Sequence, residues 1–180
     1  MNYKIILIIL FFFIFPNKSF GLIEVDITRG NLNPLPIAIS SLSSDSSTKN
    51  ELSKSLNVQD VGLEISKVIE NNFRQSGLFN PLDKDSFLQK PDIAHLKPRF
   101  EDWSLIKAQA LITGKVTYSE DKLRVEFRLW DVLAAKEMMA LAFTTVPKNW
   151  RRVGHIISDK VYERLTGEKG YFDTRIIFVS

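Results

Sequence analysis

The sequence contains no cysteine, so disulfides, thiol catalysis and thiolate metal sites are all excluded. Histidine is scarce as well: only His95 and His155 occur, and neither has a second ligand at metal-binding spacing. The GxSxG, HExxH, phosphate-loop and dinucleotide-binding glycine motifs are all absent. These absences argue against an enzyme, and we expect no catalytic residue, no cofactor and no bound metal.

Long apolar runs are also lacking, except one near the start of the chain. Ile5 to Phe15 is unbroken, follows Lys4 and stops at Pro16. This run is much shorter than the roughly 20 residues that span a membrane. The small residues Ser19 and Gly21 then form a cleavage site, which predicts a secretory signal peptide over residues 1–21. An uncleaved anchor is the alternative; after cleavage, the chain would hold no integral membrane segment.

Basic and acidic residues are nearly balanced, with 24 lysines and arginines against 21 aspartates and glutamates. The predicted signal peptide carries Lys4 and Lys18 and no acid, so its removal lowers the formal net charge from +3 to +1. A near-neutral chain with interspersed signs has no electrostatic footprint for nucleic acid. The 44% hydrophobic content is ordinary for one globular domain.

The first segment after residue 21 alternates in polarity. Ile23, Val25 and Ile27 point one way and Glu24 and Asp26 the other, which is typical of a half-buried strand. A hinge rich in glycine, asparagine and proline follows, up to about residue 35. The segment is either an edge strand of the domain's own sheet or a detachable strand that adds to a partner's sheet edge.

The next part predicts a strand, a loop and a helix. Residues 36–40 form a first core strand, and the serine-rich stretch 40–50 is expected to be a mobile loop. Asn57 is the predicted N-cap of a helix that ends at Gly77, with Asp60 in a position like that of a capping box. Its apolar stripe consists of Val58, Val61, Ile65, Val68, Ile69 and Phe73.

The remainder predicts most of a sheet and a second helix. Residues 78–82 form an edge strand because Pro81 cannot donate to a ladder, and Asp102 caps a short helix through Trp103, Leu105 and Ile106. Alternation over 110–118 and 123–129, and a third strand over 138–146, predict an antiparallel meander with one packed and one wet face. A second helix begins near Asn149 and stops at Gly167, and its buried stripe consists of Trp150, Val153, Ile157, Val161 and Leu165.

The predicted fold class is therefore α+β, an α/β sandwich in which two amphipathic helices cover a mixed β-sheet. The domain occupies residues 36–168. Residues 169–180 are interpreted as a linker and a first strand, Arg175 to Val179, of a second domain that the chain lacks.

Three strings in the chain resemble the amino-terminal domain of the TolB family. They are FRQSGLFNPLDKDSF from Phe73, EDWSLIKAQALITGKV from Glu101, and WRRVGHIISDKVYERLTGEKGYFDTRIIFVS from Trp150. Their order and spacing are kept, and the resemblance runs from the signal peptide to the last residue. One departure is Lys107, where a glycine is expected at the turn into the strand.

The resemblance implies a periplasmic protein of the Tol-Pal system in a Gram-negative bacterium, with this domain followed by a six-bladed β-propeller. In the family, the mature amino-terminal segment binds the C-terminal domain of TolA, and the propeller binds Pal. Family members maintain outer-membrane integrity and its constriction during cell division. The TolA-binding residues would be Leu22, Ile23, Glu24, Val25, Asp26, Ile27 and Thr28. The alternative is an accessory domain of a propeller-containing periplasmic hydrolase.

Overall fold

A computed structural model of the chain describes residues 33–174. The predicted signal peptide, the segment Leu22–Thr28 and the predicted strand 175–179 lie outside these residues. Five strands form one mixed sheet in the order β2-β1-β3-β4-β5. β1 (Leu35–Ile39) runs parallel to β2 (Phe79–Pro81) and to β3 (Ala110–Ser119). β4 (Lys122–Asp131) and β5 (Lys136–Thr145) complete the predicted antiparallel meander.

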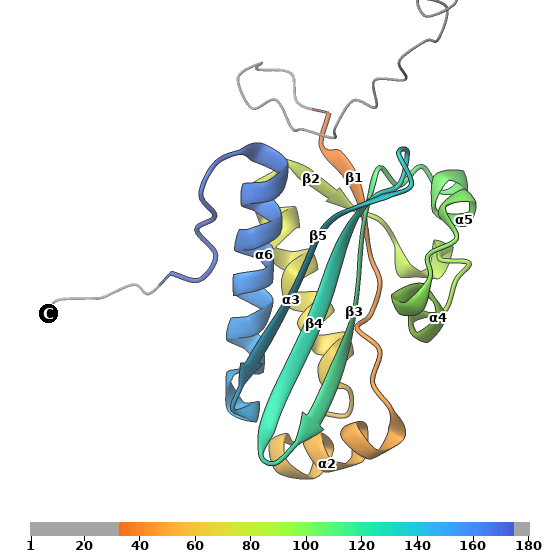
Figure 1. The fold of residues 1–180 in the computed structure, drawn as a ribbon. Coiled ribbons are helices and arrows are strands. Elements are labelled where there is room, and N and C mark those ends of the chain that lie inside the picture. Colours follow the sequence, from red (N-terminus) through yellow and green to blue (C-terminus); the bar gives the residue numbers. More distant parts are fainter. Residues whose placement is uncertain (1–32, 175–180) are drawn as a thin grey trace, which may run out of the picture.

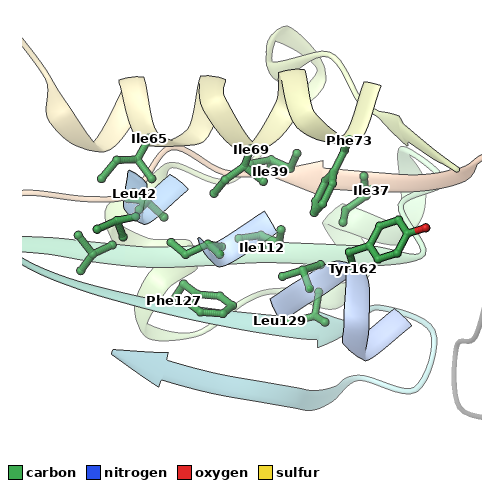
Figure 2. Close-up of a cluster of buried hydrophobic side chains, with 14 of the residues drawn as sticks. Ile37, Ile39, Leu42, Ile65, Ile69, Phe73, Ile112, Phe127, Leu129 and Tyr162 are labelled. Carbon is green, nitrogen blue, oxygen red and sulfur yellow. The ribbon is translucent and has the colours of Figure 1, made fainter. Parts of the chain in front are cut away.

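Two long helices cover one face of this sheet, as predicted (Figure 1). They are α3 (Val61–Ser76) and α6 (Trp150–Thr166). From α3, Ile65, Ile69 and Phe73 are fully buried against the sheet (Figure 2). The whole predicted stripe of α6 is buried as well. Gly77 and Gly167 end the two helices in left-handed conformations, which confirms both predicted stops.

The opposite face of the sheet is less exposed to solvent than predicted. Two short helices, α4 (Pro91–Leu96) and α5 (Phe100–Leu105), cover it over β1 and β3 (Figure 1). Trp103 of α5 packs there with Ala38 and Leu111, whose side chains alternate with those of the main core. These strands are therefore buried on both faces, and the polar face is confined to β4, β5 and the end of β3.

The predicted loop over residues 40–50 is wrong. The helix α2 (Ser46–Leu56) begins inside it, and Asp45 caps this helix by accepting a hydrogen bond from the Thr48 amide at 2.7 Å. Leu52 is 1% exposed, so burial of one leucine in the core outweighs the turn-like composition. The preceding residues are held too, because Ser43 exchanges backbone hydrogen bonds with Gly114 and Val116 of β3.

The predicted start of the next helix is also wrong. Asn57 does not cap α3 but ends α2 in a left-handed conformation, with φ of 55°. Asp60 is the true N-cap of α3 and accepts a hydrogen bond from the Leu63 amide at 3.0 Å. Asparagine favours both N-caps and left-handed C-caps, so its identity alone does not distinguish the two positions.

The short helix α5 differs from the prediction at its start. Asp102 is not its N-cap but lies in its first turn, where its carboxylate accepts a hydrogen bond from the Arg99 side chain at 2.7 Å. Beyond the last turn, Lys107 has φ of 63°. Glycine adopts this left-handed conformation without strain, which fits the glycine expected at this position from the family resemblance, and here a lysine occupies it.

Candidate protein-binding surface

The predicted partner-binding segment, Leu22 to Thr28, lies outside the described residues, so its attachment point is described instead. Asn33 and Pro34 are exposed and lead directly into β1 at Leu35. β1 is an interior strand between β2 and β3, and it is hydrogen-bonded on both sides. The segment is therefore attached to one of the most firmly held strands of the domain.

A short ladder of backbone hydrogen bonds connects this attachment point to the turn between β4 and β5. The Gln109 amide donates to the Pro36 carbonyl at 2.9 Å, and the Val132 amide donates to the Gln109 carbonyl at 2.9 Å. Neighbouring strands lie about 4.8 Å apart, so the β4–β5 turn begins roughly 10 Å from the start of β1.

An apolar groove lies beside that turn, between the turn and α5. Leu105 and Leu133 are its most exposed large side chains, at 73% and 67%. The groove is lined by Phe100, Glu101, Ser104, Leu105, Val132, Leu133 and Ala135. Exposed leucines on the two sides of one groove are typical of surfaces that contact another polypeptide. Glu101 is the charged residue of the lining.

Buried polar groups fix both walls of the groove. Gln89 is 4% exposed; its side-chain oxygen accepts hydrogen bonds from the Arg99 amide and the Trp103 indole, each at 3.0 Å. Its amide nitrogen donates to the Lys97 carbonyl at 2.9 Å, so one glutamine ties α4 to α5. On the other wall, Asp131 accepts a hydrogen bond from the Ala134 amide at 2.8 Å and shapes the β4–β5 turn.

The two histidines lie on helices that cover opposite faces of the sheet. His155 of α6 lies 3.1 Å from the side-chain amide of Asn72, which also donates to Ser158 at 2.8 Å. This contact holds α3 against α6 and confirms the structural interpretation of His155. His95 of α4 is half-buried, and its burial, together with the positive charges of Arg128 and Lys115, lowers the pKa of its imidazole.

Between residues 33 and 174, no group of three or more histidine, aspartate or glutamate side chains could hold a metal ion. Within the same range, none of the helices is both long enough and apolar enough to cross a membrane.

Sequence reasoning missed the groove. It assigned Leu105 to the apolar set of a short helix with Trp103, yet Trp103 is 1% exposed and Leu105 is largely exposed. A six-residue helix has too few turns for periodicity to show which of its apolar residues face the core. The one available signal was Leu133, an apolar residue within the short turn that joins β4 and β5.

Three comparisons with known proteins agree. The family model for the TolB amino-terminal domain matches residues 23–138. The Tol-Pal system protein TolB of Pelagibacter ubique (strain HTCC1062) is 76% identical over 169 residues, which are 94% of this chain and 38% of that protein. The chain thus spans well under half the length of this curated relative.

The fold also matches a solved structure, the crystal structure of TolB from Acinetobacter baumannii. The TM-score is 0.61 at 20% sequence identity, over 84% of this chain and 33% of that one. At this identity the match shows a shared fold and no more.

Proposed function

Because the chain belongs to the TolB family, whose amino-terminal domain it contains, we propose that it is a non-enzymatic periplasmic component of the Tol-Pal system. In this proposal its segment Leu22–Thr28, hereafter the arm, binds the C-terminal domain of TolA. The observation that carries the proposal is the 76% identity to a curated Tol-Pal protein over nearly the whole chain.

The sequence of the arm supports binding by strand addition. One face carries Ile23, Val25 and Ile27, and the other carries Glu24 and Asp26. An extended peptide that adds to a sheet edge gains affinity from its backbone hydrogen bonds and specificity from alternate side chains. The three apolar residues would therefore fill successive pockets on TolA, while the two acids face solvent or a basic rim.

The described part of the domain is compatible with the same mode. All helices and strands described between residues 33 and 174 begin at or after Leu35. Deletion of residues 22–33 stops short of Leu35 and so leaves every residue of β1 that pairs with β2 or β3 in place. In this proposal, binding of the arm to a partner leaves these helices and strands intact.

Calorimetry with purified TolA C-terminal domain tests the proposal. Deletion of residues 22–33 should abolish the binding heat, while the circular dichroism spectrum and the thermal midpoint stay close to those of the parent chain. Undiminished affinity in the deletion would rule out the arm and would move the site onto the body of the domain, where the groove at Leu105 and Leu133 is the first surface to mutate.

Point variants of the arm separate strand addition from simple charge attraction. Val25→Asp places a charge on the apolar face and should lower affinity by at least about 100-fold, since an unpaired charge in an apolar pocket costs several kcal/mol. The matched variant Glu24→Gln removes a charge from the other face and should change affinity by less than about 5-fold at physiological ionic strength. A larger loss for Glu24→Gln than for Val25→Asp would contradict the strand-addition mode.

In this proposal, the contact with the outer membrane is made by a part of the full-length family protein that this chain does not span. We expect Pal to be bound mainly by the propeller of full-length members. In the complete protein, the arm would then connect TolA to Pal, in support of envelope integrity and of outer-membrane constriction during division.

A further inference from the structure

The chain turns back on itself after its last helix. α6 ends at Thr166, and residues 168–173 return alongside the helix to the level of Asp159 (Figure 1). At roughly 1.5 Å per helical residue, the return covers about 10 Å of the helix. Three separate contacts hold the four residues Gly170–Asp173, hereafter the latch.

The first contact is a carboxylate that caps two consecutive amides. Asp159 accepts a hydrogen bond from the Phe172 amide at 2.7 Å through Oδ1, and from the Asp173 amide at 3.1 Å through Oδ2. Hydrogen bonds to an ionised acceptor are stronger than those between neutral groups. A single side chain of α6 thus fixes the backbone direction at the end of the latch.

The second contact is an ion pair two turns earlier on α6. Arg152 donates from Nε and Nη2 to the carboxylate of Asp173, with all three nitrogen–oxygen distances at 3.1 Å. Residues seven apart in a helix lie on the same face, so Arg152 and Asp159 hold the latch from one side of α6. The pair is partly exposed, and its role is to set geometry more than to add stability.

The third contact is the packing of Phe172 against the main core. Its ring lies edge-on to Tyr162, with centroids 5.8 Å apart, and to Phe73 at 6.3 Å. Two residues earlier, Gly170 touches the helix backbone: a Cβ atom there would lie 2.4 Å from the Asp159 Cα. Real Cβ atoms do not approach a backbone atom so closely, so any side chain at position 170 would push the latch off α6.

We propose that the latch is a joint that fixes where, and in which direction, the chain leaves this domain. The family model describes an amino-terminal domain, and the curated relative is much longer than the part matched here. In such proteins, a further part of the chain follows the latch. Closed, the latch starts that part beside the middle of α6; open, residues 167–173 become a tether of up to about 23 Å.

The joint is built to open without unfolding the domain. Two of its three contacts are polar and lie at the surface of α6, and Phe172 is only partly buried. Local opening of such segments requires much less free energy than global unfolding. When the latch is closed, the part of the chain that follows it starts beside α6. When the latch is open, that part can lie farther from the domain. This inference does not depend on TolA binding.

Distance measurements by pulsed electron paramagnetic resonance test the joint on the purified chain. Because the chain has no cysteine, Lys148→Cys and Thr174→Cys together provide two unique spin-label sites, both exposed. The parent should give one narrow distance distribution. Gly170→Ala and Asp159→Ala should each broaden it and add longer distances, whereas the neighbouring surface variant Lys160→Ala should leave it unchanged.

Amide hydrogen exchange provides the second measurement. In Asp159→Ala, the Phe172 and Asp173 amides should exchange at least about 10-fold faster, while the amides of Ile157 and Val161 in α6 keep their rates. A broad distribution in the parent, or a narrow one in both latch variants, would overturn the proposal. Equal acceleration along the whole of α6 would overturn it as well, since the latch would then open only with the domain.

Discussion

At the scale of single residues, Phe73 connects the core to both ends of the domain. It is fully buried at the end of α3, and its ring lies 4.7 Å from that of Phe79 in β2. The ring of Phe172, in the latch, lies edge-on to it, with centroids 6.3 Å apart. One side chain therefore supports a helix, an edge strand and the segment where the chain leaves.

We expect Phe73→Ala to lower the free energy of unfolding by roughly 3–5 kcal/mol, as for other fully buried phenylalanines. Denaturant titration followed by tryptophan fluorescence measures this loss. A loss below about 1 kcal/mol would mean that the site collapses around the missing ring or that the ring is not buried.

His95 gives the domain a pH dependence that can be assigned to one residue. Burial against the sheet, followed by the charges of Arg128 and Lys115, lowers its pKa in the folded chain, and Glu126 opposes this in part. As the pH falls below the ordinary histidine pKa of about 6.5, the unfolded chain therefore takes up the proton first. The stability that is present above this pH is lost as the pH falls towards the lowered pKa.

The expected result is a fall in the free energy of unfolding as the pH is lowered from neutral through the ordinary histidine pKa, and a flatter profile in His95→Gln. Urea titrations at a series of pH values measure both profiles. Parallel profiles for the parent and His95→Gln would contradict the assignment.

At the scale of elements, the junction between α2 and α3 shows how a few capping residues define two helices. Asp45 begins α2, Asn57 ends it, and Asp60 begins α3 three residues later. Lys49 of α2 reaches across the junction to Asp60, with 2.8 Å between Nζ and Oδ2. The angle between the two helices is thus fixed by two polar residues on one side and by Leu52 and Val61 in the core.

Substitutions at the junction distinguish the two caps. Asp60→Ala should lower the free energy of unfolding by about 1 kcal/mol because the Leu63 amide loses its acceptor. Asn57→Gly should leave it unchanged or raise it, since glycine adopts the left-handed conformation without strain. Thermal denaturation of both variants is sufficient, and the opposite order of effects would restore Asn57 as the cap of α3.

At the scale of the whole molecule, the layer formed by α3 and α6 depends on one close approach. A Cβ atom at Gly154 would lie 2.8 Å from Cγ1 of Val68 and 3.4 Å from the Ile65 carbonyl oxygen. The helices therefore touch at the first turns of α6, where Asn72 also bonds to His155 and Ser158. The packing of this layer presents Phe73 and Tyr162 to Phe172 and so supports the latch.

Gly154→Ala should separate the two helices and lower the free energy of unfolding by about 1–3 kcal/mol, the usual cost of overpacking a tight contact. The latch should open more readily in the same variant, which the spin-label pair at positions 148 and 174 would report. Unchanged stability would show that Val68 can move aside. The double variant Gly154→Ala/Val68→Ala removes the contact with Cγ1 but keeps the 2.9 Å contact with the Val68 Cβ, so it should recover at most part of the lost stability.

Local sequence patterns determined much of this fold. The stripes of α3 and α6 and the alternation of β3 and β4 predicted their elements because each long element repeats its burial over many residues. The edge position of β2 followed from Pro81, and the family followed from three strings of ordinary core and turn residues. The arm was recognised in the same way and remains a prediction.

Tertiary contacts decided the rest. α2 exists because Leu52 finds a place in the core, and neither α4 nor α5 is long enough for its own pattern to show which face it buries. Leu105 became exposed and Trp103 buried because Gln89 fixes how α5 lies on the sheet. The latch depends on Asp159, Arg152 and Phe73, which are 13 to 99 residues away from it in the chain. Interactions over such separations leave no periodicity in a single sequence, so only the folded structure reveals them.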